Sequence, residues 1–163
     1  MDTTMHALHK GNVGIVVLLE TKLTRGIHTR FSSGYKVWET EAKSRHWGGI
    51  SIVWMKEWVW EVEGLHLFGP NLVSFTVTSG KKRWYVVGAY VPPNNFLAVQ
   101  RITYELAFGT EGLGKMLVGD LNACLSNPRN QREEHLATVI AGHFLTDQER
   151  LFVPRWGYRA EGN

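Results

Sequence analysis

Residues 116–122 read Met-Leu-Val-Gly-Asp-Leu-Asn, a short apolar segment followed by two polar side chains. The apolar residues 115–118 predict a buried β-strand, and Gly119 permits a tight backbone turn at its end. Asp120 and Asn122 are two positions apart, so their side chains can point to the same side. A carboxylate and an amide in that arrangement can hold and orient a water molecule or a phosphate oxygen. The stretch therefore predicts a strand that carries a polar site at its end.

Two earlier strands are also predicted to end in polar groups. Residues 13–19 form a nearly continuous apolar run, which is typical of a strand buried on both faces, and Glu20 follows it directly. A carboxylate held at the end of a rigid strand suits Mg²⁺, although this position taken alone fits a surface glutamate that ends a strand better. Tyr90 ends the strand predicted over 84–90, and Pro92-Pro93 prevents its continuation. Its phenol is either a hydrogen-bond donor to a phosphate or a half-buried core side chain.

The rest of the chain alternates short apolar strands with a few helices. The turn at 79–82 predicts an antiparallel hairpin, and helical spacing marks 96–108. This pattern predicts packed sheets of mixed strand direction covered by helices, an α/β (α+β) fold. The remaining predicted strands are 35–39, 48–54, 59–62 and 72–78, and the remaining helices are 3–10 and 133–141.

Composition places the chain among intracellular globular domains. Its 163 residues, 44% of them hydrophobic, suit one domain over 1–163. No apolar run approaches the roughly 20 residues that span a bilayer, so no membrane contact is expected. The first residues do not resemble a secretory signal. Cys124 is the only cysteine, which excludes an internal disulfide and a cysteine metal cage and favours the nucleus or cytoplasm.

The charge is mildly basic, with a net formal charge of +3 and an isoelectric point near 9.1. Six Lys and Arg residues but only two acids lie between Lys22 and His46. This segment fits a surface that binds a polyanion, and it also fits a solvated loop. Lys81-Lys82-Arg83 follows Ser79-Gly80 and fits the tip of a hairpin turn better than a binding patch.

Two other patterns could suggest a binding site, but their residues argue against it. Residues 109–116 resemble the sequence pattern of a phosphate-binding loop. However, Met116 stands where Ser or Thr should contact Mg²⁺, and the loop leads into a predicted strand instead of the helix that such a loop requires. Trp54, Trp58 and Trp60 have strand spacing, which indicates core packing more than base stacking.

The three strand ends, taken in order, resemble the endonuclease/exonuclease/phosphatase family. The resemblance rests on Glu20, on Tyr90-Val91-Pro92-Pro93 and on Gly119-Asp120-Leu121-Asn122, with Gly48-Gly49-Ile50 between the first two. The segment from Gly119 to Pro128 and the helix from Arg132 are similar to the fungal retrotransposon endonuclease branch in particular. The resemblance runs from about Val13 to Phe152.

This resemblance implies a four-layer sandwich of two mixed β-sheets flanked by helices. It implies metal-dependent cleavage of a phosphodiester, most specifically DNA nicking for a retroelement whose reverse transcriptase portion is an expected partner. In that reaction Glu20 would ligate Mg²⁺ or Mn²⁺, and Asp120 would orient or deprotonate the attacking water. Asn122 would help to hold the phosphate, and Tyr90 would contact it.

The sequence also departs from the family. The family's first strand, which carries an Asn, has no counterpart, and neither does its terminal Ser-Asp-His motif, since none of Asp2, Asp120 and Asp147 precedes a His. We therefore expect an incomplete domain, truncated at both ends, with open sheet edges and impaired catalysis. Two alternatives remain: a relative that hydrolyses a small phosphate ester, and a degenerate remnant that does not catalyse.

Overall fold

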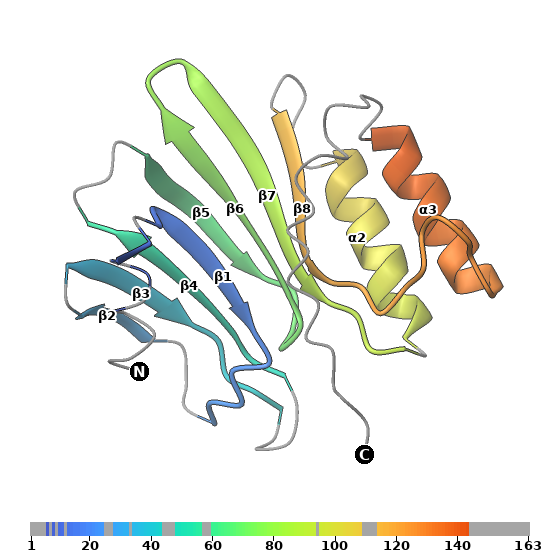
Figure 1. The fold of residues 1–163 in the computed structure, drawn as a ribbon, viewed down its shortest axis with the longest axis horizontal. Coiled ribbons are helices and arrows are strands. Elements are labelled where there is room, and N and C mark those ends of the chain that lie inside the picture. Colours follow the sequence, from blue (N-terminus) through green and yellow to red (C-terminus); the bar gives the residue numbers. More distant parts are fainter. Residues whose placement is uncertain are drawn as a thin grey trace.

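A computed structural model of the chain contains two β-sheets and two long helices (Figure 1). It describes residues 6, 8, 10, 11, 13–24, 28–32, 34–43, 48–56, 60–93, 95–108 and 114–143. The helical backbone at His6, Leu8 and Lys10 agrees with the predicted helix over 3–10. The predictions for 144–152, including the loop around Asp147, lie outside the described residues.

The first sheet has the strand order β1-β4-β3-β2, and each of its neighbouring pairs is antiparallel. The second has the order β5-β6-β7-β8, in which β7 and β8 are parallel and the other pairs are antiparallel. The strands of the first sheet are β1 (Ile15–Leu19), β2 (His28–Ser32), β3 (Tyr35–Glu39) and β4 (Ile50–Met55). Those of the second are β5 (Glu61–Leu67), β6 (Leu72–Ser79), β7 (Lys82–Tyr90) and β8 (Gly114–Asp120).

The main core lies between the two sheets. Alternate residues of a strand point to opposite faces of its sheet, and the apolar pattern follows this rule. Ile50, Ile52 and Trp54 of β4 pack against Val73 and other apolar residues of the second sheet. Trp54 is 7% exposed, so it belongs to the core, as its spacing predicted.

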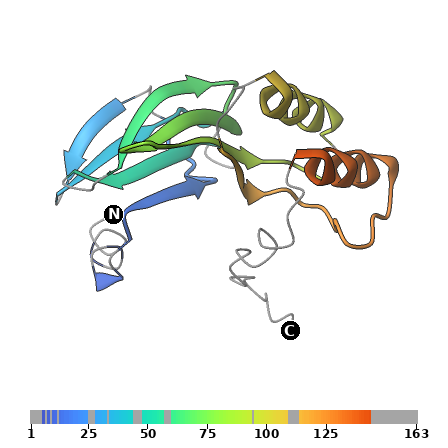
Figure 2. The same cartoon turned by 90° about the horizontal axis from the view of Figure 1, so that it is seen from above.

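Each sheet also has a covered outer face. On the second sheet, α2 (Phe96–Phe108) and α3 (Gln131–His143) lie side by side (Figure 2) and bury Val99, Ile102 and Leu136 against β6 and β7. On the first, Leu8 packs against the cluster that contains Val53. The arrangement is therefore layered as predicted: helical residues, sheet, sheet and helices.

Most predicted elements are confirmed as helices or strands, with small shifts at their ends. The predicted burial of two strands is wrong, because β1 is half-buried at every position and β8 is half-buried or exposed. The helix predicted over 96–108 is α2, and the predicted hairpin turns between Ser79 and Lys82, which are paired. Strand β2 was not predicted, and β5 extends to Leu67, beyond its predicted end. The expectation that both sheets are mixed holds for the second sheet only, because the first is antiparallel in every described pair.

One close contact between the two sheets involves β1. Gly88 on β7 faces Val17 on β1, and a Cβ at Gly88 would lie 3.1 Å from a Val17 methyl group and 3.0 Å from one of Val73. The missing side chain lets β1 approach β7 at this level. Strands β1, β7 and β8 then run in the same general direction, so their carboxyl ends reach the same edge of the molecule (Figure 1).

Candidate active site

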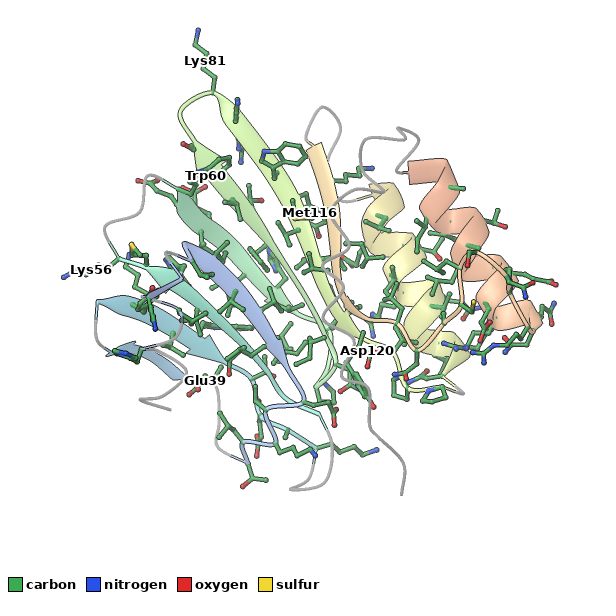
Figure 3. The ribbon with its side chains drawn as sticks, viewed as in Figure 1. Glu39, Lys56, Trp60, Lys81, Met116 and Asp120 are labelled. Atoms are coloured by element: carbon green, nitrogen blue, oxygen red, sulfur yellow. The ribbon has the colours of Figure 1, made fainter. Side chains whose placement is uncertain are left out.

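Three strand ends meet at the lower edge of the two sheets in Figure 1, and each carries a residue singled out from the sequence. Glu20 follows β1, Tyr90 ends β7 and Asp120 ends β8. Figure 3 shows Asp120 at this edge and Lys81 at the opposite end of the second sheet. The basic group around Lys81 is therefore a hairpin tip remote from the site, as its sequence indicated.

The pairing of β7 with β8 brings Asp120 next to Tyr90. The two residues are partners in the parallel register, and the Val91 N–H donates to the Asp120 carbonyl at 2.8 Å. Gly119 makes this possible, since a Cβ there would lie only 1.8 Å from the carbonyl oxygen of Ala89. The glycine of the Gly-Asp-Leu-Asn stretch is thus required by the close approach of two backbones.

Glu20 is held by Gly48 and Gly49, the glycine pair that contributed to the family resemblance. The Gly48 N–H donates to Glu20 Oε1 at 2.7 Å, and the N–H groups of Thr21 and Lys22 donate to the Gly49 and Gly48 carbonyls. A Cβ at Gly49 would lie 2.5 Å from Thr21 Oγ1. Gly48 and Gly49 therefore dock the segment after β1 and orient its carboxylate.

The turn after β8 places Asp120 and Asn122 as neighbours. The Asn122 N–H donates to Asp120 Oδ1 at 3.0 Å, and the Asn122 side-chain amide donates to the Val91 carbonyl at 3.0 Å. Asp120 is exposed and Asn122 is half-buried. The carboxylate is therefore open to solvent water, while the amide ties the turn to the segment that follows β7.

The pKa of the Tyr90 phenol depends on the other three predicted site residues. Burial raises the pKa of the Tyr90 phenol, and the negative charges of Glu20 and then Asp120 raise it further. A hydrogen bond from the Asn122 side chain acts in the opposite direction and lowers the pKa. Four residues spread over about a hundred positions of sequence thus interact around one phenol, which stays protonated at neutral pH.

Backbone conformation marks the same place. Only three of the described non-glycine residues have positive φ, and these are Glu20 at 55°, Lys22 at 57° and Asn122 at 44°. Such conformations are uncommon outside glycine and concentrate at functional sites. Two of these three residues were chosen from the sequence for their chemistry, so strain and chemistry coincide.

The structure adds three residues that the sequence did not reveal. The Asn71 carbonyl accepts the Tyr90 N–H at 2.8 Å, and its side-chain Oδ1 lies 3.2 Å from where a Cβ would be on Gly48. At the start of α3, Arg132 donates to the Leu121 carbonyl in the turn after β8, and Glu133 accepts the Arg129 N–H at 2.9 Å. Asn130 followed three residues later by Glu133 was a usable signal for the helix start.

The donor set suits a hydrated hard cation, not a protein cage. No group of three or more His, Cys, Asp or Glu among the described residues is arranged to hold a metal. Mg²⁺ commonly binds through one or two carboxylates and keeps several waters. The single oriented carboxylate of Glu20 fits that mode of binding.

Other sequence signals find structural explanations. Gly114 begins β8, so the glycine-rich stretch leads into a strand as expected, and a Cβ there would lie 2.5 Å from the Trp84 ring. Residues 109–113 lie outside the described part of the chain, as do Arg25 and Arg45 of the basic segment. No helix in the described ranges has both the length and the apolar character needed to cross a membrane.

Comparison with known proteins supports the fold. No family model matches the chain, and no curated protein does. Among solved structures, it is similar to the endonuclease domain of TRAS1, a telomere-specific non-LTR retrotransposon, with a TM-score of 0.60 and 14% sequence identity. The match covers 85% of this chain and 62% of that one, so the chain spans less than two thirds of the neighbour's length. The fold is therefore nuclease-like.

Proposed function

We propose that this chain is the site-bearing part of a metal-dependent phosphodiester hydrolase that nicks DNA. The observation that carries the proposal is the meeting of Glu20, Tyr90, Asp120 and Asn122 at one edge of a nuclease-like fold. The likeness to a retrotransposon endonuclease domain supports a retroelement DNA-nicking role over hydrolysis of a small phosphate ester.

Each side chain has a role that follows from its surroundings. Asp120 is an exposed carboxylate whose Oδ1 accepts the Asn122 N–H, and we assign it the orientation or deprotonation of the attacking water. The pKa of Tyr90 is raised above its ordinary value of 10.0, so its hydroxyl is protonated at neutral pH and can donate to a phosphate oxygen. Asn122 helps to hold the phosphate and keeps the turn in register with Val91.

Glu20 is the residue that would hold Mg²⁺ or Mn²⁺, with Gly48 fixing one of its oxygens. A divalent cation there would supply neutralisation of the charge on the phosphate oxygens.

The test is nicking of supercoiled plasmid by the purified chain in Mg²⁺. Asp120→Asn is the informative variant because its retained Oδ1 can still accept the Asn122 N–H while the negative charge is lost. We expect loss of activity by about a hundredfold or more, the usual contribution of a general base. Glu63→Gln, on exposed β5, is the matched control and should nick like the parent chain.

The outcomes separate the alternatives. Nicking that requires Mg²⁺ and Asp120 supports the proposal. Hydrolysis of bis(p-nitrophenyl) phosphate without plasmid nicking favours a small-ester hydrolase. A folded chain that cleaves neither substrate is the degenerate remnant, and the proposal is then wrong.

A further inference from the structure

Arg132 is a buried cation beside the candidate site. It lies in the first turn of α3 and is only 8% exposed, which is unusual for arginine unless it is paired. Its guanidinium donates to two consecutive backbone carbonyls, those of Leu121 at 3.3 Å and of Asn122. These carbonyls belong to the turn that carries the site amide.

Glu133 balances the charge of Arg132 while the guanidinium stays in contact with the turn. Glu133 Oε1 lies 3.9 Å from Arg132 Nη2 and 3.0 Å from Arg129 Nη2, so this buried carboxylate serves two cations. Arg129 Nη2 is the closer partner, and its side chain is 69% exposed. Arg132 is therefore left to make its shorter contacts with the two carbonyls.

The turn has an unusual backbone conformation. Asn122 has a φ of 44°, in the left-handed region that most side chains disfavour and that asparagine tolerates better. A planar guanidinium can hold two carbonyls at once, which a lysine ammonium cannot do with the same geometry.

We propose that Arg132 is a positioning residue that fixes the Leu121–Asn122 turn and thereby the Asn122 amide beside Tyr90. Its effect on rate rests on the function proposed above, whereas its effect on the turn does not. Arg132 acts through the backbone of Asn122 and has no assigned contact with substrate.

The test combines amide hydrogen exchange by NMR with nicking kinetics on Arg132→Met and Arg132→Lys. We expect Arg132→Met to speed exchange at the Asn122 N–H about tenfold, the size expected from losing hydrogen bonds to a charged donor. Exchange at Val86, in the centre of β7, reports general stability and should change much less. The kcat should fall about tenfold while KM for DNA stays unchanged.

Arg129→Met is the control, because it removes the stronger partner of Glu133 but touches neither carbonyl. It should leave exchange at Asn122 and the kcat near those of the parent chain. Arg132→Lys keeps the positive charge, so it serves as the second variant if Arg132→Met does not fold. It should still speed exchange at Asn122 relative to Val86.

Each result decides one question. If the Arg132 variants speed hydrogen exchange at the Asn122 N–H more than at Val86, the positioning role is supported. This holds even if the parent chain does not nick DNA, in which case only the proposed function fails. Equal acceleration at Asn122 and Val86 in both Arg132 variants, or an unchanged Asn122, would overturn the inference.

Discussion

Gly119→Ala is the most severe single-methyl change that the structure predicts. The added Cβ would lie 1.8 Å from the Ala89 carbonyl oxygen, 2.8 Å from its carbon and 3.0 Å from its nitrogen. All three atoms belong to the backbone of β7, so no side chain can rotate away. An ordinary contact begins near 3.4 Å, so the two strands must separate by about 1.6 Å at this point (3.4 − 1.8).

The expected loss in the free energy of unfolding of Gly119→Ala has two parts. Gly119 has a φ of 149°, and an unfavourable φ costs an L-residue on the order of 1–2 kcal/mol. Separation of the strands also disrupts the local ladder, including the 2.8 Å bond from the Val91 N–H to the Asp120 carbonyl, at about 1 kcal/mol or more for each bond. We expect a loss of about 4 kcal/mol in the free energy of unfolding, a large part of the roughly 5–15 kcal/mol of a typical domain.

The assay is urea unfolding followed by tryptophan fluorescence, with two matched glycine variants. Gly64→Ala has a φ of 58° and nothing within 4 Å of its new Cβ, so it isolates the backbone cost at about 1 kcal/mol. Gly142→Ala in α3 also meets nothing within 4 Å and should stabilise by about 0.5–1 kcal/mol. A Gly119→Ala chain within 0.5 kcal/mol of Gly64→Ala would refute the reasoning about the β7–β8 approach.

Two further predictions follow from titration. Hydrogen bonds from Arg129 lower the pKa of Glu133 below its usual 4.5, so its stabilisation is present above that pH and is lost as the pH falls through the folded pKa. The difference in stability between the parent chain and Glu133→Gln should therefore be largest near neutral pH and shrink in acid, as measured by urea unfolding at each pH. The raised pKa of Tyr90 should appear in an ultraviolet titration as a tyrosine that ionises above pH 10, and Glu20→Gln or Asp120→Asn should lower it.

The absorbance of Tyr90 is assigned by difference with Tyr90→Phe. A Tyr90 pKa insensitive to both carboxylate variants would mean that Glu20 and Asp120 do not lie beside the phenol. Glu63→Gln serves as the carboxylate control here too, because it lies on exposed β5 and should leave the titration unchanged.

Much of the secondary structure was predictable because its signals are local. The apolar runs before Glu20 and in 84–90 identified β1 and β7, and the spacing of apolar residues located α2 with its observed bounds. Strand β2 was not predicted because His28–Ser32 has no alternating apolar pattern. Its position is set by pairing with β3.

The candidate site was predictable as a set of residue types, not as a geometry. Glu20, Tyr90, Asp120 and Asn122 could each be proposed from the end of an apolar strand. The sequence contained no signal that Gly88 lets β1, which leads to Glu20, approach β7, which leads to Tyr90. Resemblance to a family supplied the grouping that local patterns could not.

The sequence by itself determined where strands end in polar groups, because hydrophobic periodicity and turn residues act over a few neighbouring positions. The tertiary structure alone decided that Arg132, ten residues after Asn122, holds that residue's carbonyl, and that Gly48 holds Glu20 across 28 positions. These contacts depend on how sheets and helices pack, and the packing is set by side chains distributed over the whole chain. Sequence therefore identified the chemistry, and packing determined which groups meet.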